Sequence, residues 1–416
     1  MLNVIFTRPE AVLSYLYGLM QKSTDTRLQT LENLIDTEKF LQPAIISWYL
    51  LNKRPLPWRH EPEPYRVWLS EIILQQTRVD QGLPYYERFV AAYPDLASFA
   101  RAPEEDILRL WQGLGYYSRA RNMLTAARQV MEEHGGRFPV TAIQLKSLKG
   151  IGDYTAAAIS SSCFNEPDAV VDGNVYRVLA RYFGIDLAID SGAGKRFFAV
   201  LAQGLLPIAE AAVYNQAIMD FGALQCKPAP LCQTCPLQNR CVALADHRVR
   251  ELPFKAVKTK TRNRFFNYLI WKVAGAAVPE KSLSKARSAG DRLPPSPQPA
   301  AVESVYILRR GPGDIWQGLF DFPLIETETE LLPTDLLVNP AFVRQMAGQP
   351  FVLKSACHTF KHILSHQVIY ARFWELQVSP EFAPENNTLT LVKKHDLHTY
   401  AMSRLALRYL ETTSEE

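Results

Sequence analysis

Apolar residues recur at spacings of three and four positions through most of the first 250 residues. This spacing puts them on one face of a helix, so it predicts amphipathic helices. The clearest cases are residues 65–79, 104–114, 119–135 and 214–225. Gly135, Gly136 and Pro139 separate consecutive helices, because glycine and proline commonly end or restart them. This part of the chain is therefore predicted to be helical almost throughout.

The pattern changes in the last third of the chain. Residues 265–273, 302–310 and 366–376 are rich in aromatic and β-branched side chains, which is typical of β-strands. We therefore predict a separate α+β domain over residues 262–416. Within it, residues 276–300 are rich in Pro, Ser, Ala and charged residues, and we predict that they form a mobile insertion.

Composition shifts divide the rest of the chain. Residues 1–40 are polar and weakly helical, without candidate chemistry, and we expect an N-terminal extension there. Residues 41–247 form the predicted helical core. A basic linker, residues 248–261, follows, and it is either a solvated tether or a segment that contacts phosphate.

Bulk composition narrows the possible functions. A chain of 416 residues is natural for two domains, and 47% hydrophobic with 21% charged residues is a globular balance. The net charge is only +4, so binding to nucleic acid would depend on local basic patches. No apolar run approaches the roughly 18 residues of a membrane span, and the N-terminal stretch is a poor signal peptide. We expect a cytoplasmic monomer without membrane contact, nucleoid-associated in a prokaryote.

The stretch "LKGIGDYTAAAIS", residues 148–160, predicts a helical hairpin. Gly150 and Gly152 flank Ile151 in the turn, and a second helix begins near Asp153. The unpaired N–H groups at a helix start attract anions, and glycines let a phosphodiester approach the backbone. The turn is therefore either a grip on DNA phosphate or an ordinary tight helix–helix turn.

A carboxylate follows downstream in "VVDGNVYRVLARYFGI", residues 170–185. Asp172 directly precedes Gly173 and Asn174, and a helix is predicted from Val175. An aspartate in that place is commonly only a helix cap. If the hairpin holds DNA, the same carboxylate could face the sugar of the held nucleotide.

Four of the six cysteines fall within 16 residues, as Cys226, Cys232, Cys235 and Cys241. The spacing C-x5-C-x2-C-x5-C, in a chain without an export signal, favours metal over disulfides. Zinc and a [4Fe–4S] cluster both fit, and spacing alone does not choose between them. Cys163 and Cys357 stand apart and are predicted to be buried, inert thiols.

The order hairpin, "DGNV", cysteine loop resembles the helix-hairpin-helix DNA glycosylase superfamily, which includes endonuclease III, over roughly residues 41–245. The resemblance implies a [4Fe–4S] cluster, although the first gap has five residues where the family usually has six. Members that also cleave the DNA backbone carry a lysine two residues after the second glycine. Here that position is Tyr154, and a phenol cannot form an imine, so lyase chemistry should be missing.

Three further segments, "KRPLPWR", "SEIILQQT" and "GLGYYSRARNM", resemble the adenine DNA glycosylase (MutY) family. By its residues alone, Glu71 on an apolar helix either pairs with a cation or has a raised pKa. The resemblance implies that Glu71 protonates adenine, that Asp172 opposes the charge developing on the sugar, and that Asn174 and Tyr154 position these groups. It also implies an adenine pocket and groups that enter the duplex: Arg54, Leu56 and Trp58 for the pocket, and Gln75, Gln76 and the wedge Tyr116 for the duplex.

The C-terminal domain fits the same resemblance. "WQGLFDFPL", residues 316–324, resembles Nudix-like domains, but no glutamate-rich hydrolase segment follows, so the domain should bind without hydrolysing. The segment "HTFKHILSH", residues 358–366, is similar to the MutY loop that reads 8-oxoguanine. Two registers are possible, one with Ser365 and His366 as readers and one with Lys361. We favour the first, because a predicted strand follows it directly.

The sequence thus predicts a mostly α helix-hairpin-helix glycosylase core with an iron–sulfur loop, followed by an α+β Nudix-like domain. The implied activity is removal of adenine opposite 8-oxoguanine or guanine in double-stranded DNA, without strand cleavage. One alternative is a bifunctional endonuclease III-like glycosylase/lyase, against which Tyr154 argues. The other is a non-catalytic iron–sulfur DNA-binding protein, which would not need both Glu71 and Asp172.

Overall fold

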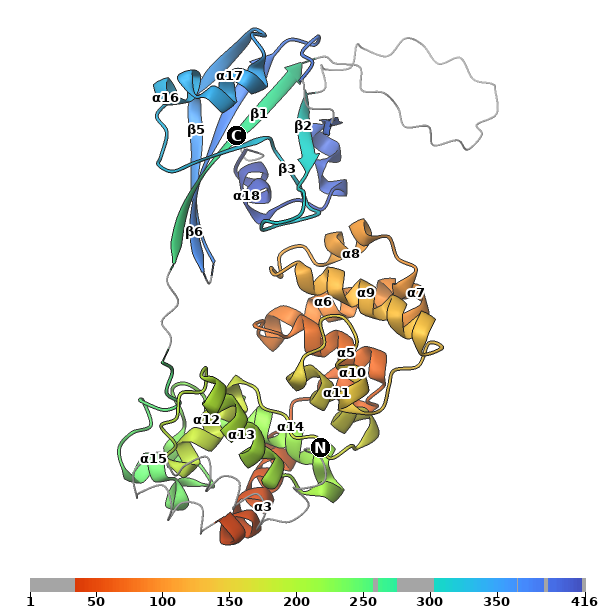
Figure 1. The fold of residues 1–416 in the computed structure, drawn as a ribbon, viewed down its shortest axis with the longest axis vertical. Coiled ribbons are helices and arrows are strands. Elements are labelled where there is room, and N and C mark those ends of the chain that lie inside the picture. Colours follow the sequence, from red (N-terminus) through yellow and green to blue (C-terminus); the bar gives the residue numbers. More distant parts are fainter. Residues whose placement is uncertain (1–33, 257–260, 275–302, 365, 385–387, 414–416) are drawn as a thin grey trace. The chain divides into compact units, whose positions relative to one another are not determined.

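The computed structural model describes residues 34–256, 261–274, 303–364, 366–384 and 388–413. The chain divides into two compact units, residues 1–101 with 122–258 and residues 102–121 with 259–416 (Figure 1). The predicted extension up to residue 33 and the predicted insertion 276–300 lie outside the described residues.

The described part of the first unit is helical, as the three- and four-residue spacing predicts. Its helices are α3 (Leu34–Asn52), α4 (Pro57–His60), α5 (Pro64–Ile73), α6 (Val79–Ala92), α7 (Leu96–Ala100), α9 (Ser118–Glu133, which begins in the second unit), α10 (Ala142–Leu145), α11 (Asp153–Phe164), α12 (Gly173–Phe183), α13 (Gly192–Gly204), α14 (Ala211–Asp220) and α15 (Val242–Ala245). A π-helical turn, Phe221–Gln225, extends α14. The predicted helices 119–135 and 214–225 correspond to α9 and to α14 with this turn.

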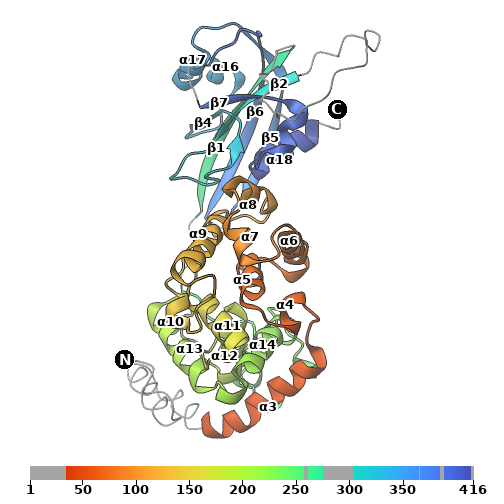
Figure 2. The ribbon, with the colours of Figure 1, turned by 90° about the vertical axis from the view of Figure 1, so that its right-hand side faces the viewer.

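The core of this unit lies between helices that are distant in the sequence. Helix α14 packs on α3 and α11, and the contact of α11 with α14 is visible in both views (Figures 1 and 2). Leu41, Val178 and Phe198, from α3, α12 and α13, are at most 1% exposed in this cluster. The packing fixes α11 and α12, whose first residues are Asp153 and Gly173.

The second unit is built on a mixed sheet of seven strands in the order β3-β2-β1-β6-β5, with β4 on β1 and β7 on β2. The strands are β1 (Arg262–Ala274), β2 (Glu303–Arg309), β3 (Phe320–Asp321), β4 (Leu324–Thr327), β5 (Phe351–Ile363), β6 (Gln367–Val378) and β7 (Leu389–Lys393). The unit also has helices α8 (Glu104–Leu110), α16 (Pro333–Val338), α17 (Pro340–Met346) and α18 (Arg404–Thr413). Strands β1 and β6 run parallel, while the other pairs are antiparallel.

Alternate residues of β1 enter two cores on opposite faces of the sheet, because side chains alternate along a strand. Leu269 and Trp271 pack with Phe342 of α17 on one face. On the other face, Tyr268 stacks on Phe373, which in turn stacks on Tyr409 of α18 at a ring distance of 4.7 Å. Figure 1 shows α16 and α17 on one side of the sheet and α18 on the other. The predicted α+β domain is confirmed.

No single helix in the described ranges is long and apolar enough to cross a membrane. One bent pair, Gly192–Gly204 with Ile208–Gln225, passes the length and composition test jointly, with a bend of 96°.

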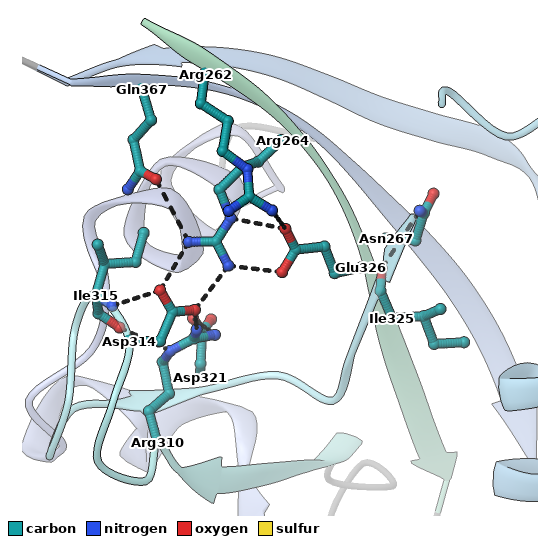
Figure 3. A network of polar contacts seen from close by, with 10 residues as sticks. All are labelled: Arg262, Arg264, Asn267, Arg310, Asp314, Ile315, Asp321, Ile325, Glu326 and Gln367. Atoms are coloured by element: carbon teal, nitrogen blue, oxygen red, sulfur yellow. Dashed lines mark hydrogen bonds and ion pairs between the residues drawn. The ribbon is translucent and has the colours of Figure 1, made fainter. Parts of the chain in front are cut away.

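A polar network ties the start of β1 to the neighbouring loops (Figure 3). The Arg264 guanidinium donates to both carboxylate oxygens of Asp314, at 2.7 and 2.8 Å, and to both of Glu326, at 2.7 and 2.6 Å. Arg310 joins the network through Asp314, at 3.0 Å, and lies 3.7 Å from the fully buried Asp321. These contacts hold four chain segments together at one edge of the sheet.

Asp321 is the unusual member of this network, because its carboxyl group is completely shielded from water. Burial raises the pKa of Asp321 to about 6, although Arg310, the Tyr268 hydroxyl and the Phe322 N–H all favour the ionised form. The folded state therefore binds a proton more tightly than the unfolded chain does. The stability contributed by the protonated form is complete below the unfolded pKa near pH 4 and is lost as the pH rises through about 6.

We predict that Asp321→Asn removes this loss. Between pH 4 and pH 6.5 the unfolding free energy of the second unit should change in favour of the variant by up to about 3 kcal/mol, at roughly 1.4 kcal/mol per unit of pKa. Urea unfolding of both proteins at several pH values, followed through a signal of the second unit, measures the difference. Parallel pH profiles for the two proteins would contradict the prediction, whatever their absolute stabilities.

Candidate active site

Glu71 and Tyr154 meet inside the first unit. Glu71 lies on α5, whose neighbouring residues Trp68 and Ile72 are buried, and Tyr154 is the second residue of α11. The Tyr154 hydroxyl donates a hydrogen bond to Glu71 Oε2 at 2.8 Å. Burial raises the pKa of Tyr154 well above its ordinary value, and the nearby Glu71 and Asp172 carboxylates raise it further. The phenol therefore stays protonated and acts as a donor.

The pKa of Glu71 is raised, mainly because burial disfavours the charged carboxylate. The Tyr154 hydrogen bond and the Arg59 charge lower this pKa, while the negative charge of Asp172 raises it. Of the two possibilities that the sequence left for Glu71, the raised pKa is the one found. A carboxyl group of this kind is suited to hold a proton and to donate it.

Asp172 caps α12, and its carboxylate accepts three hydrogen bonds. Its Oδ1 accepts from the N–H groups of Asn174 and Val175 at 2.9 and 2.8 Å, and its Oδ2 accepts from the Asn174 amide at 2.7 Å. Burial raises the pKa of Asp172, and all three hydrogen bonds oppose that rise. Asp172 is thus a helix cap and, at the same time, a carboxylate close enough to Glu71 to affect its pKa.

Arg177, which was not among the predicted site residues, holds the Asn174 side chain in place. Its guanidinium donates to the Asn174 side-chain oxygen at 2.7 Å and to the carbonyls of Gly222 and Cys226 at 2.6 and 2.7 Å. A Cβ on Gly222 would lie 2.7 Å from the Asn174 Cβ, so only glycine allows this approach. The Asp172 cap is therefore connected, through Asn174 and Arg177, to the start of the cysteine loop.

A cavity of about 220 Å³ opens onto Glu71. Trp58, Arg59, Val67 and Gln216 are among the residues that line it. The Gln216 amide N–H donates to Ser162 Oγ at 3.2 Å. The predicted pocket residue Trp58 therefore borders the same cavity as Glu71. Sequence reasoning missed Gln216, because it stands in an ordinary helical segment.

Arg59, which lines the cavity, and Arg54 share one buried counterion. Asp220, at the end of α14, is fully buried; Arg54 donates to its Oδ1, and Arg59 binds both of its oxygens, at 2.6 and 3.0 Å. Burial alone would raise the pKa of Asp220, but the two arginines outweigh it and lower the pKa. The predicted pocket residue Arg54 is thus held by Asp220, and the predicted Leu56 is buried at 8% exposure.

The hairpin forms as predicted, but the constraint at Gly150 is internal. Gly150 has φ +80°, and a Cβ there would come within 2.8 Å of the Asn122 Cβ. Asn122 and the positive φ therefore already require a glycine at this position, whether or not a phosphate also approaches it. Gly152 is exposed, caps α11 without a side chain, and has open space where a Cβ would stand. Ile151 anchors the turn at 6% exposure.

Of the predicted duplex-entering residues, Gln76 and Tyr116 are exposed, whereas Gln75 is half-buried. Gln75 donates to Thr155 Oγ1 at 3.2 Å, whereas Gln76 is exposed and left-handed, at φ 58°. In the second unit, Tyr116 is 47% exposed and also left-handed, at φ 49°. Arg119 braces its loop by donating to the carbonyls of Leu114 and Gly115 at 3.3 and 3.2 Å. Both loops present a side chain outward from a strained backbone.

The predicted reading segment forms the β5–β6 hairpin of the second unit. Leu364 N–H donates to the Gln367 carbonyl at 2.8 Å, His366 is exposed, and Ser365 lies outside the described residues. A cavity of about 330 Å³ in this unit is lined by Tyr116, His362, Leu364 and His366, among others. Lys361 instead lies over the Tyr370 ring, at 5.5 Å, and lines a different cavity.

The four cysteines form a compact loop after the π-helical turn. Tight turns join them, with Cys235 N–H donating to the Cys232 carbonyl at 3.2 Å, and Arg181 lies 3.7 Å from the Cys226 sulfur. Burial raises the pKa of Cys226, Cys235 and Cys241, and the neighbouring thiols of the loop add to the rise. As the side chains stand, no three Cys, His, Asp or Glu residues of the described chain form a group that could hold a metal ion. The loop supplies four soft donors in one place, without a preformed single-ion site.

Cys163 and Cys357, the two isolated cysteines, were predicted to be buried, inert thiols. Cys163 is half-buried, which corrects the prediction of a buried thiol, yet the burial that it has still raises its pKa to about 12. It remains protonated and unreactive at neutral pH. The side chain of Cys357 lies outside the described residues.

Comparison with known proteins gives matches over both units. Residues 69–196 match the family model "HhH-GPD superfamily base excision DNA repair protein", and residues 300–412 match the "NUDIX domain" model. The adenine DNA glycosylase of Mus musculus is 32% identical over 86% of this chain and 77% of its own length. The adenine DNA glycosylase of Buchnera aphidicola (strain Bp) is 31% identical over 79% of this chain and 83% of its own. Among solved structures, a thermostable thymine-DNA glycosylase matches 51% of this chain and 99% of its own, with 28% identity and a TM-score of 0.48.

The shared counterion gives a stability prediction. Asp220→Asn should destabilise the first unit by roughly 3 kcal/mol, because Arg54 and Arg59 would then lack the only carboxylate with which they pair among the described residues. Glu251→Gln is the matched control, since its ion pair with Arg248 is exposed and should be worth less than about 1 kcal/mol. Denaturant unfolding of both variants measures the two effects, and equal losses would contradict the special role of Asp220.

Proposed function

The chain belongs to the adenine DNA glycosylase family, and on this premise we propose that it is a monofunctional DNA glycosylase of base excision repair. It hydrolyses the N-glycosidic bond of adenine mispaired with 8-oxoguanine or guanine in double-stranded DNA. The observation that carries the proposal is the pairing of a raised-pKa carboxyl, Glu71, with a phenol, Tyr154, at the edge of a cavity.

Glu71 acts as the general acid. The adenine is rotated out of the helix into the cavity at a cost of a few kcal/mol. Protonation of the adenine ring at N7 by Glu71 makes the base a better leaving group, and the raised pKa keeps the proton available near neutral pH. The Tyr154 hydrogen bond to Oε2 fixes the carboxyl group, so that its other oxygen faces the base.

Asp172 opposes the positive charge of the oxocarbenium-like sugar, and water then adds to that sugar. The different roles of the two carboxyl groups follow from the number of hydrogen-bond donors around each. Glu71 accepts one hydrogen bond and Asp172 accepts three. Hydrogen bonds to the ionised form favour it, so Asp172 is the better anion and Glu71 the better acid. Asn174 keeps the Asp172 carboxylate oriented.

The remaining predicted residues supply the grip on DNA. The exposed start of α11, at Gly152, leaves backbone N–H groups for a phosphate. Gln76 and Tyr116 extend from left-handed positions suited to entering a duplex. The β5–β6 hairpin reads 8-oxoguanine, and a cavity shared by Tyr116 with His362, Leu364 and His366 supports this role.

The four loop cysteines would hold a [4Fe–4S] cluster, which the donor set and the family support. Bound there, the cluster would cross-link the loop that follows α14. The Arg181 charge beside the Cys226 sulfur favours the thiolate that a ligand requires, and the Cys226 carbonyl accepts from Arg177.

Replacing the proposed acid gives the direct test. Glu71→Gln keeps the shape of the side chain but cannot donate the catalytic proton, so adenine release should fall by about 10²-fold or more while DNA binding stays nearly unchanged. Single-turnover assays on duplexes with adenine opposite 8-oxoguanine, with abasic sites cleaved by alkali, measure the effect. Glu63→Gln is the control, because Glu63 caps the opposite, N-terminal end of the same helix and does not line the cavity. A Glu71→Gln rate within about tenfold of wild type would refute the assignment.

The competing glycosylase/lyase function predicts a covalent imine with DNA. We expect no product trapped by borohydride in the wild-type protein, because Tyr154 occupies the position of the attacking lysine. Tyr154→Lys is the companion variant, since it restores an amine at that position. A strong trapped band in the wild type would move the protein to the bifunctional class.

The two possible registers of the hairpin that reads 8-oxoguanine predict different effects of mutation. If Ser365 and His366 read 8-oxoguanine, their joint replacement by alanine should reduce the preference for 8-oxoguanine over guanine by tens of fold, at roughly 1–3 kcal/mol for each good contact. Lys361→Ala should leave the preference unchanged, because this side chain lines another cavity. The reverse outcome would assign the reading role to the register that contains Lys361 and His362. Rates on adenine opposite guanine and opposite 8-oxoguanine give the ratio.

A further inference from the structure

The segment that leads into Asp172 has no regular secondary structure. Residues 165–172 follow the end of α11 and precede α12, and none of them belongs to a helix or a strand. Backbone N–H and C=O groups that no helix or sheet pairs must find partners among neighbouring side chains or water. The place of the Asp172 carboxylate therefore depends in part on contacts that other elements make with this segment.

Asn215 of α14 contacts the segment from the interior of the first unit. Its side-chain N–H groups donate to the Asp168 carbonyl at 2.8 Å and to Ser161 Oγ at 2.9 Å. Its side-chain oxygen accepts from the Val170 N–H at 3.2 Å. Asn215 and Val170 are each 1% exposed. Both N–H groups and the oxygen of the amide are therefore paired inside the unit.

These hydrogen bonds connect three elements of the proposed active site. Ser161 lies on α11, the helix that carries Tyr154. Val170 directly precedes Val171 and Asp172 in the chain. Asn215 thereby ties α14 and α11 to the backbone next to the Asp172 carboxylate.

Gln203 of α13 contacts the same segment but is less buried. Its amide donates to the Pro167 carbonyl at 2.7 Å, and its side-chain oxygen accepts from the Ala169 N–H at 3.0 Å. Because Gln203 is only half-buried, water can replace both bonds when the side chain is removed. Loss of the Asn215 amide would instead leave the buried Val170 N–H without its partner, which is costly.

We propose that Asn215 is a positioning residue for Asp172. It acts through the Val170 backbone and fixes the carboxylate relative to Glu71. The cap on α12 holds the same carboxylate from the helix that follows, whereas Asn215 holds it from the segment that precedes. This inference rests on the proposed function, because only there does Asp172 take part in a reaction.

The test measures adenine release by the full chain from a duplex with adenine opposite 8-oxoguanine, in single turnovers. Asn215→Ala should lower the rate by roughly 10- to 100-fold, because a displacement of about 1 Å in an active site can cost as much. The Kd for the same duplex should stay within about twofold, since Asn215 is buried and does not reach the DNA. Gln203→Ala is the matched control, because it also removes two hydrogen bonds to the segment, and its rate should stay within about threefold of the wild type.

A second background separates positioning from a general loss of stability. In Asp172→Asn the carboxylate that Asn215 is proposed to position is already absent. Adding Asn215→Ala there should cost less than about threefold more, because residues that act as a unit have non-additive effects. A purely structural role of Asn215 would lower the rate by the same factor in both backgrounds. Circular dichroism at the assay temperature shows whether each variant is folded.

Should Asn215→Ala fail to fold, Ser161→Ala takes its place, since it removes one partner of the Asn215 amide and keeps the other two. It should give a smaller loss that is likewise absent from the Asp172→Asn background. The inference is overturned if the folded variant reacts within about threefold of the wild type, if Gln203→Ala loses as much, or if the full loss persists in Asp172→Asn. A wild type that binds the duplex but releases no adenine would refute the proposed function and, with it, this inference.

Discussion

The hydrogen bond from Tyr154 to Glu71 is the contact on which the rest of the site depends. It joins α5 to the first turn of α11 and involves a phenol that cannot ionise at neutral pH. Because the hairpin before α11 sets where Tyr154 stands, the same hairpin also orients the Glu71 carboxyl group. Packing of α11 against α5 and α14 makes this geometry rigid.

The charged side chains around this contact are neutralised by their neighbours to different extents. The Arg59 charge lowers the pKa of Glu71, but burial outweighs it, and Arg59 itself is bound by both carboxylate oxygens of Asp220. Asp172, with three donors, is stabilised as an anion to a greater extent than Glu71 with one. Burial raises the pKa of both carboxyl groups, and the hydrogen bonds that oppose this rise are more numerous at Asp172 than at Glu71.

In the second unit, ion pairing and burial also set the charge of carboxyl groups, and there these groups support the fold. Arg264 is satisfied by two carboxylates, whereas Asp321 is buried with too few favourable charges to keep its ordinary pKa. The Trp271 N–H and the Gln345 side-chain oxygen are also buried, without a hydrogen-bond partner among the described residues.

The sequence by itself determined the features that depend on neighbouring residues. A glycine turn followed by Tyr154, an aspartate at the start of α12 and a four-cysteine loop all follow from spacings of a few positions, as do the helical and strand periods. The tertiary structure alone decided that Asp220 neutralises Arg59, across 161 positions of sequence, and that Asn122 is what excludes a side chain at Gly150. It also decided that Arg177 links Asn174 to the cysteine loop and that Gln216 borders the Glu71 cavity. Local periodicity encodes which face of an element is apolar, but it carries no information on which distant element that face meets, and these contacts are made only when the helices and strands pack.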